Sequence, residues 1–389
     1  MLRKSCQSLS ILIVLIALSS CAFFRAEVVD IEPVSKSRAL ELDSAFERLL
    51  DKHKINTIGV AVIKNGAVDW QGYFGEQSPG VKASADTLFN VASITKTVTS
   101  ETILRLASAG KISLDEPMSL YWVDPDLKYD PDLKKLTPRM ALTHTSGFMN
   151  WRFFANDYKL KFVSEPGTKF GYSGEGFQYV AKYAENKLGV PFEALVKSTV
   201  FEPMGINDVS ISVRKKNYAR IAKPLDKDGK FYGYYCHPEG YCRKEAEYSA
   251  AGDMVITVAD YAKFFIASMQ GNKLTEQLKN ERNTLQSIQV DRKDIDCSGA
   301  PDALCPIQLG YGLGWSVAQL ENDRLIGHRG SDWSTVSLAY CYQNSGDGLI
   351  IFFNAPNKAG IAAMVEALEL LDPDSPEIHG YKMRRARTD

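Results

Sequence analysis

The chain has 389 residues, of which 45% are hydrophobic and 24% charged, proportions that are typical of a soluble globular protein. Its net charge is −1 at pH 7, so the strongly basic surface of a nucleic-acid-binding protein is not expected. The length is sufficient for one large hydrophobic core or for two or three smaller domains.

The N-terminus has the features of an export signal. Arg3 and Lys4 precede the apolar run Ile11–Leu18, which is too short to span a bilayer but typical of a signal peptide. The next residues, Leu18-Ser19-Ser20-Cys21, resemble a bacterial lipobox, in which the cysteine is lipidated and becomes the mature N-terminus. A simple signal cleaved after Ala22 is the alternative.

Lipidation at Cys21 would anchor the protein to a membrane if the residue carries two or more acyl chains. Residues 1–21 would then be the signal peptide and residues 22–36 a tether in front of a folded domain expected over residues 37–372. Alanine rather than aspartate follows Cys21. By resemblance to Gram-negative lipoproteins, this favours the outer membrane of the cell envelope, with the domain facing the periplasm.

The cysteines also fit an oxidising compartment. Cys236 and Cys242 are six residues apart and Cys297 and Cys305 eight apart, so each pair is predicted to form a local disulfide, whereas Cys341 is left over. Free thiols in loops are the alternative. Only five histidines and no Cys-x-x-Cys pair are present, so no metal is expected, and no organic cofactor is implied.

The first part of the folded domain is predicted to contain a helix and a β-hairpin. Residues 37–53 have apolar side chains at helical spacing. The β-branched runs 57–63 and 67–73 flank Asn65-Gly66, which is a strong signal for a hairpin turn. Residues from about 90 to 300 favour helices and long loops.

Strands return near the C-terminus and are followed by a helix. The two strands at 335–342 and 349–353 flank a segment rich in turn-forming residues. Strands at both ends with helices between them predict an α+β fold: an antiparallel sheet built from both termini, flanked by helices, with an inserted mainly helical lobe. The basic end, residues 373–389, is expected to be a solvated tail. The predicted C-terminal elements are strands at 314–320, 324–328, 335–342 and 349–353 and a helix at 359–371.

A candidate nucleophile lies at the start of a predicted helix that ends before Gly110. Ser93 and Lys96 are three residues apart and therefore share one face of this helix. A serine hydroxyl needs a base within hydrogen-bond reach, and a lysine can be that base when burial or nearby cations lower its pKa. Because Ser-x-x-Lys also arises by chance, an ordinary solvated helix is the alternative unless further motifs accompany it.

Further motifs do accompany it, in the order typical of one family. The stretch from Leu88 to Trp122 resembles the nucleophile region of class C β-lactamases and their relatives, which include serine esterases, D-aminopeptidases and D-Ala-D-Ala carboxypeptidases. The resemblance extends over about residues 40–370 and implies the β-lactamase/transpeptidase-like fold. The other matching blocks are Leu142–Gly147, Pro166-Gly167, Phe170–Gly174, Ala251–Met254, Tyr311–Trp315 and His328–Gly330.

The resemblance implies roles for particular residues. Ser93 would attack a carbonyl carbon, while Lys96 and Tyr172 would share the proton transfers. The backbone N–H groups of Ser93 and Ser331 would form the oxyanion hole. His144 would have a structural role in its loop. His328 would help to orient the substrate, Gly330 would let it approach the strand closely, and Arg329 would grip a substrate carboxylate unless strand alternation turns it away.

Two departures from the family pattern bear on the substrate. Gly174 stands where the Tyr-x-Asn motif has an asparagine that holds the amide of a β-lactam or peptide. His328 replaces the lysine of Lys-Thr-Gly, and a neutral histidine is a poorer partner for a carboxylate. We therefore expect a serine hydrolase acting on an ester or a D-amino-acid peptide, with weak activity at most on β-lactams. The alternative is a non-catalytic cell-wall or penicillin-binding protein that retains the fold.

Overall fold

The computed structural model describes residues 31–295, 297 and 304–388. The predicted signal peptide, its lipidation site Cys21 and residues 22–30 of the predicted tether lie outside these residues. From Ile31 onward the chain is docked on the folded domain: Ile31 is buried, and its N–H donates to the carboxylate of Asp347 at 2.9 Å. The predicted tether, residues 22–36, is therefore too long: residues 31–35 lead directly into α1 (Lys36–His53), which already includes residue 36.

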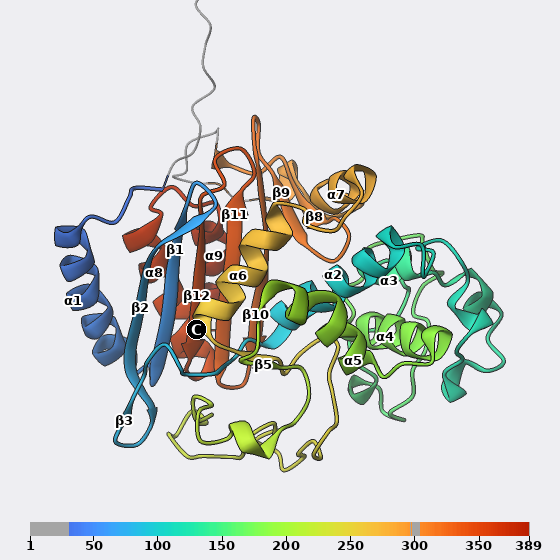
Figure 1. Ribbon diagram of the computed structural model, residues 1–389, viewed down its shortest axis with the longest axis horizontal. Coiled ribbons are helices and arrows are strands. Elements are labelled where there is room, and N and C mark those ends of the chain that lie inside the picture. Colours follow the sequence, from blue (N-terminus) through green and yellow to red (C-terminus); the bar gives the residue numbers. More distant parts are fainter. Residues whose placement is uncertain (1–30, 296, 298–303, 389) are drawn as a thin grey trace, which may run out of the picture.

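A nine-stranded sheet with strand order β3-β2-β1-β12-β11-β10-β9-β8-β7 forms the centre of the molecule (Figure 1). All of its pairings are antiparallel, and β1 from the N-terminal half lies beside β12 from the C-terminal end. The predicted antiparallel sheet built from both termini is thus confirmed. Its strands are β1 (Thr57–Lys64), β2 (Ala67–Ser78), β3 (Val81–Lys82), β7 (Ser287–Asp291), β8 (Gln308–Tyr311), β9 (Ser316–Gln319), β10 (Arg324–Asp332), β11 (Thr335–Tyr342) and β12 (Gly348–Asn354).

Local chemistry accounts for the hairpin between β1 and β2. Asn65 and Gly66 have φ angles of 50° and 71°, the left-handed conformations that asparagine and glycine adopt most readily. Strand β7, in contrast, lies in the stretch of residues 90–300 where the sequence favoured helices and loops, and β8 lies between that stretch and the first predicted C-terminal strand. They are short, and they extend the sheet at an edge where periodicity is a weak signal.

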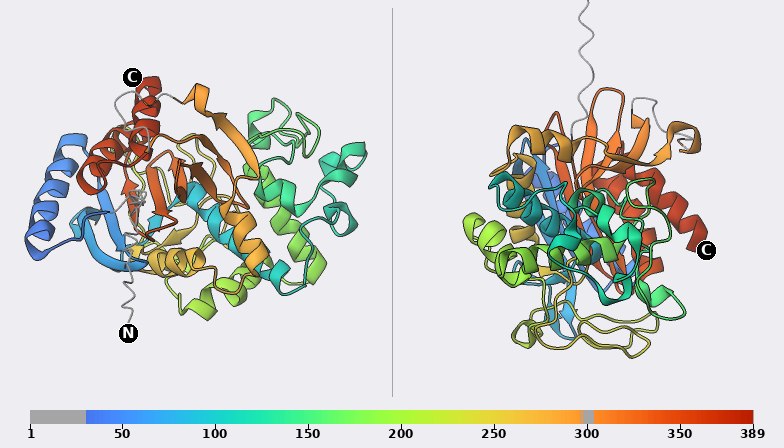
Figure 2. Two further views of the ribbon diagram at one scale, coloured as in Figure 1. Left: turned by 90° about the horizontal axis from the view of Figure 1, so that it is seen from above. Right: turned by 90° about the vertical axis from the view of Figure 1, so that its right-hand side faces the viewer.

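Helices cover both faces of this sheet (Figures 1 and 2). On one face, α1, α8 (Asn357–Leu371) and α9 (Glu377–Thr388) bury side chains such as Phe46, Leu368 and Tyr381. On the other, α2 (Thr95–Ser108) and α6 (Val258–Met269) belong to the larger core cluster. Every residue of β11 and β12 is buried, because these two strands are covered on both sides.

The C-terminal segment is not the solvated tail that the sequence predicted. Most of residues 373–389 form α9, in which Tyr381 is fully buried and Ile378 nearly so. The Tyr381 ring is contacted by two guanidinium groups, those of Arg329 and Arg384, each 5.4 Å from the ring centroid. The short basic run therefore belongs to a docked helix whose burial depends on contacts with β10.

The helical lobe lies to one side of the sheet and includes α3, α4 and α5 (Figure 1). A three-stranded sheet of order β4-β6-β5 lies outside the main sheet. The remaining elements named here are α3 (Pro138–Leu142), α4 (Gly174–Leu188), α5 (Phe192–Val196), α7 (Glu276–Asn283), β4 (Phe89–Asn90), β5 (Val209–Ser210) and β6 (Val255–Ile256).

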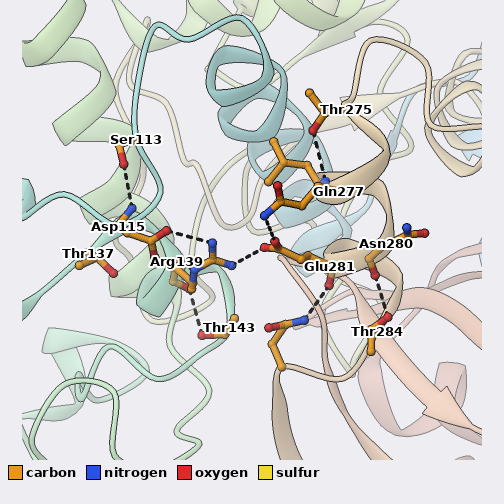
Figure 3. Close-up of polar contacts among 12 residues, drawn as sticks. Ser113, Asp115, Thr137, Arg139, Thr143, Thr275, Gln277, Asn280, Glu281 and Thr284 are labelled. Carbon is orange, nitrogen blue, oxygen red and sulfur yellow. Dashed lines mark hydrogen bonds and ion pairs between the residues drawn. The ribbon is translucent and has the colours of Figure 1, made fainter.

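Arg139 connects this lobe to α7 (Figure 3). Its guanidinium forms ion pairs of 2.6 Å with both Asp115 and Glu281, and these carboxylates raise the pKa of Arg139. The Glu281 carboxylate also accepts a hydrogen bond from Gln277 at 2.8 Å. The charge network therefore links α3 and the segment that carries Asp115 to α7.

Both predicted disulfides are present, Cys236–Cys242 and Cys297–Cys305, and Cys341 is a buried free thiol in β11. Arg243, next to the first disulfide, forms an ion pair with Asp253. No helix among the described residues combines the length and the apolar composition that crossing a membrane requires.

Candidate active site

Ser93 lies in a tight turn immediately before α2. The turn Ala92–Ile94 is a short 3₁₀ helix, and Ala92 has a φ angle of 45°, an uncommon left-handed conformation for a residue with a Cβ. Two side chains hold it: Asn90 accepts a hydrogen bond from the Ala92 N–H at 2.8 Å, and the Thr95 hydroxyl donates to the Ala92 carbonyl at 2.6 Å. Strain held in this way is typical of functional sites.

Lys96 lies directly beneath the Ser93 hydroxyl. Its amine nitrogen is 3.1 Å from the Ser93 oxygen and 2.8 Å from the carbonyl oxygen of Ala251. The side chain is completely buried, and burial lowers the pKa of Lys96 to about 7, although the nearby Asp253 carboxylate opposes the shift. At neutral pH a large fraction of this amine is therefore uncharged and able to accept a proton.

Tyr172 completes the group around Ser93. Its phenol is hydrogen-bonded to the Ser93 hydroxyl, and the Lys96 nitrogen lies 4.9 Å from the centroid of its ring. Removal from water raises the pKa of Tyr172, while the Ser93 hydrogen bond and the charge of Arg384 on α9 partly counteract this rise. The phenol is consequently protonated at neutral pH and is positioned to donate.

His144 supports Tyr172 from behind. The two ring centroids are 4.3 Å apart, and the backbone N–H of Ser173 donates to the His144 Nδ1 at 3.0 Å. Burial, together with Lys96 and His328, lowers the pKa of His144 well below its usual range, so the ring is neutral. Its position orients the Tyr172 segment and places no His144 nitrogen against Ser93.

The part of β10 that has no strand partner on one side lies next to this group. β10 pairs with β11 as far as Asp332 but with β9 only as far as Gly327, so residues 328–332 have no strand partner on that side among the described residues. A Cβ at Gly330 would lie closer than van der Waals contact to the Val91 carbonyl and 3.3 Å from the Ser93 nitrogen. Glycine is thus needed for β10 to approach the Ser93 turn.

His328 and Tyr311 line the same side. His328 is buried, and its Nδ1 lies 2.6 Å from the carbonyl oxygen of Arg329, which identifies Nδ1 as the protonated nitrogen. Its Nε2 is 3.5 Å from the Tyr311 hydroxyl. Burial, reinforced by Lys96, lowers the pKa of His328 to about 3, so this ring offers an uncharged surface at neutral pH.

Arg329 does not join the group: of the two alternatives for its side chain, the structure favours the one in which strand alternation turns it away from the substrate side. Its guanidinium forms a 2.5 Å ion pair with Glu377 and packs on Tyr381 in α9. Successive side chains on a strand point to opposite faces, so Arg329 is directed away from His328. The Ser331 side chain likewise turns to α8, where its hydroxyl contacts Asn357 at 2.5 Å.

Three residues near Ser93 escaped the sequence analysis. Asp253, which has a φ angle of 65°, raises the pKa of Lys96 through its charge and so lowers the proportion of uncharged amine. The charge of Arg384 lowers the pKa of the Tyr172 phenol. Trp151 lies with its ring centroid 5.9 Å from the Lys96 nitrogen. Asp253 stood inside a recognised block, but Arg384 and Trp151 lie in segments that carry no motif.

Comparisons with known proteins identify the family of this chain. The family model described as Beta-lactamase matches residues 42–371. A β-lactamase of Pseudomonas fluorescens is 29% identical over 49% of this chain and 55% of its own length. Esterase EstB of Burkholderia gladioli is 26% identical over 47% of this chain and 54% of its own. The chain thus spans about half the length of these two relatives.

Among solved structures, the octameric penicillin-binding protein homologue from Pyrococcus abyssi superposes with a TM-score of 0.65 at 22% identity. The superposition covers 87% of this chain and 78% of that protein. At this level of identity, the likeness demonstrates a shared fold.

Proposed function

Because the chain belongs to the beta-lactamase family, we propose that it is a serine hydrolase that works through a covalent acyl-enzyme on Ser93. One observation carries the proposal: the amine of Lys96 lies 3.1 Å from the hydroxyl of Ser93, and Tyr172, from a distant part of the chain, places its phenol against Ser93 and its ring centroid 4.9 Å from the Lys96 nitrogen. A nucleophile next to a base of lowered pKa is the arrangement that covalent acyl transfer requires.

In the acylation step, the Ser93 oxygen forms a bond to the substrate carbonyl carbon as the uncharged Lys96 amine takes the hydroxyl proton. The carbonyl oxygen becomes an oxyanion, for which we assign the backbone N–H groups of Ser93 and Ser331 as donors. The bond to the leaving group then breaks, and Tyr172 gives its proton to the departing oxygen or nitrogen. Lys96 can restore the proton of Tyr172.

In deacylation the same groups act on water. The Lys96 amine, or the Tyr172 oxygen while it is deprotonated, takes a proton as the water oxygen attacks the acyl carbon, and Ser93 leaves with a proton returned to it. Gly330 lets β10 pack against the Ser93 turn, which keeps the unpaired edge of this strand next to the nucleophile. His328, which is uncharged at neutral pH, would contact the substrate without attracting a carboxylate.

Esters fit this site better than D-amino-acid peptides. Gly174 has no side-chain amide that could bind a peptide group. His328 carries no charge at neutral pH and the Arg329 guanidinium is paired with Glu377, so neither is available to a substrate carboxylate. A site without partners for buried peptide groups discriminates against them. The similarity to esterase EstB supports the same choice. Hydrolysis of D-amino-acid peptides remains the second candidate, because the D-alanyl-D-alanine-carboxypeptidase/endopeptidase AmpH of Escherichia coli is 23% identical over 62% of this chain.

A labelled fluorophosphonate, with mass spectrometry of the modified peptide, tests the mechanism. We expect one adduct on Ser93, its loss in Ser93→Ala, and loss of p-nitrophenyl ester hydrolysis in the same variant. Ser44→Ala, which removes an exposed hydroxyl on α1, serves as the matched control. Nitrocefin and a D-Ala-D-Ala peptide, assayed beside the esters, rank the substrate classes. Ester turnover that survives Ser93→Ala would refute the Ser93 mechanism, whereas the absence of both adduct and turnover in the wild type would support the non-catalytic alternative.

A further inference from the structure

The indole of Trp151 occupies the space beside Gly174. A Cβ built on Gly174 would lie no farther than 2.7 Å from three indole atoms, well inside van der Waals contact. The conflict is with a flat ring and cannot be relieved by moving the tip of a flexible side chain. The indole of Trp151 therefore fills the space that a side chain at position 174 would occupy. A polar side chain at 174 and the indole in its observed position exclude each other.

Trp151 is held in this position from both sides. Its neighbour Asn150 binds the first turn of α4, with the Gly174 N–H donating to the Asn150 side-chain oxygen at 2.9 Å and to its carbonyl oxygen at 3.0 Å. Arg152 binds Glu175 through its Nε at 3.0 Å, its terminal nitrogen at 2.9 Å and its backbone N–H at 2.9 Å. The segment that carries the indole is thus fastened to α4 by neutral and charged hydrogen bonds.

The indole leads from the reactive groups to the surface. Its ring centroid lies 5.9 Å from the Lys96 nitrogen, which contacts Ser93. On the outer side Trp151 stacks on Phe153, with centroids 5.7 Å apart, and Phe153 meets Phe154 edge-on at 4.7 Å. Phe153 and Phe154 are 50% and 64% exposed. A contiguous exposed aromatic surface that starts at a nucleophile is suited to contact an apolar part of a ligand.

We propose that Trp151, continued by Phe153 and Phe154, is the specificity-determining wall of the active site and selects esters that carry an apolar group beside the scissile bond. The inference rests on the proposed function, because it names the substrate class of the Ser93 site. An alkyl or aryl group gains by covering the indole, whereas a peptide N–H or C=O placed there would lose water without gaining a partner.

Two series of esters test the proposal. One varies the acyl chain of p-nitrophenyl esters from acetate to octanoate, and the other varies the alcohol of acetate esters from methyl to hexyl. In at least one series we expect kcat/KM of the wild type to rise by about tenfold over four added methylene groups. In Trp151→Ala this slope should flatten while the shortest ester is still hydrolysed, and Trp151→Phe should restore part of it.

Tyr158→Ala is the matched control, because Tyr158 is another exposed aromatic side chain of the same loop region. Circular dichroism establishes that each variant is folded, and Trp151→Phe keeps the test available if Trp151→Ala does not fold. Two outcomes overturn the role of Trp151 and leave the proposed function standing. One is Ser93-dependent turnover whose kcat/KM does not change with chain length in either wild-type series; the other is a slope that neither Trp151→Ala nor Trp151→Phe changes. Turnover that is independent of Ser93 instead overturns the proposed function.

Discussion

The amine nitrogen of Lys96 lies 3.1 Å from the hydroxyl oxygen of Ser93, at the bottom of a site in which the lysine has no contact with bulk solvent. Two opposing influences act on the charge of this amine. Burial favours the uncharged form, and the Asp253 carboxylate favours the ammonium. The pKa of about 7 that results links the chemistry of the site to the pH around the protein.

The activity should therefore rise with pH. If uncharged Lys96 is the base, kcat/KM of a neutral ester increases as the amine loses its proton, with a midpoint near 7. Asp253→Asn removes the charge that raises this pKa, so the midpoint should move to lower pH, and asparagine tolerates the left-handed backbone at this position. Asp228→Asn, which removes an exposed carboxylate, should leave it unchanged. A pH–rate profile of each variant is the measurement; an unshifted midpoint in Asp253→Asn would contradict the assignment.

Lys96 should also leave a mark on stability. Folding lowers its pKa from 10.5 to about 7, so between these values the unfolded chain binds more protons and the free energy of unfolding rises with pH. Lys96→Met lacks this group. The stability difference between wild type and Lys96→Met should change by about 1.4 kcal/mol per pH unit in the middle of that window, in favour of the wild type at higher pH. Urea unfolding at pH 7.5 and pH 9 with the disulfides intact measures it, and a difference independent of pH would show that the amine is not buried.

The ion pair between Arg329 and Glu377 should be structural. Glu377→Gln leaves the guanidinium without its carboxylate against β10, and since the Arg329 side chain is 34% exposed we expect a loss of only about 1 kcal/mol in stability. The KM for an ester that carries a carboxylate should not change. Lys382→Ala, which breaks the more exposed ion pair between Lys382 of α9 and Glu369 of α8, is the control. A clear rise in KM for the anionic ester alone would restore Arg329 as a substrate ligand.

Arg139 offers a test of how the lobe is held. Arg139→Met removes two ion pairs, with Asp115 and Glu281, and should lower the free energy of unfolding by about 1–2 kcal/mol. Because the following loop carries His144, kcat should fall as well, without a shift in the pH midpoint. Lys135→Met, which removes an exposed lysine of the same lobe, should have a smaller effect on both quantities. Equal effects of the two variants would contradict the bridging role.

For the N-terminus, we propose lipidation at Cys21 and attachment to the outer membrane. In a Gram-negative host, the full-length chain should incorporate radiolabelled palmitate and sediment with membranes, because two or more acyl chains anchor a protein firmly. Cys21→Ala should abolish labelling and release the protein. Cys6→Ala, which changes a cysteine inside the signal, is the control. Labelling that persists in Cys21→Ala would refute this site.

The local features of the chain were readable from the order of its residues. Asn65-Gly66 demands a turn because few residues accept left-handed backbone, and the β-branched runs beside it suit strands. The three-residue spacing of Ser93 and Lys96 predicted that the two side chains lie close together on one face of a helix. The blocks around Tyr172 and His328 indicated that these distant segments lie near Ser93. These inferences depend on short-range geometry or on a family pattern, and neither needs the coordinates of this chain.

Other properties depend on which segments pack together. Arg329 stands in a recognised block, but the direction of its side chain follows from the pleat of β10 and from the carboxylate of α9 on that face. Residues 377–388 are basic and too few to form a stable helix in isolation. They are helical here because Tyr381 is buried against β10 and β11. The contact between Trp151 and Gly174 has no signature in sequence, because two residues far apart along the chain come together only when the Asn150–Arg152 segment docks on α4.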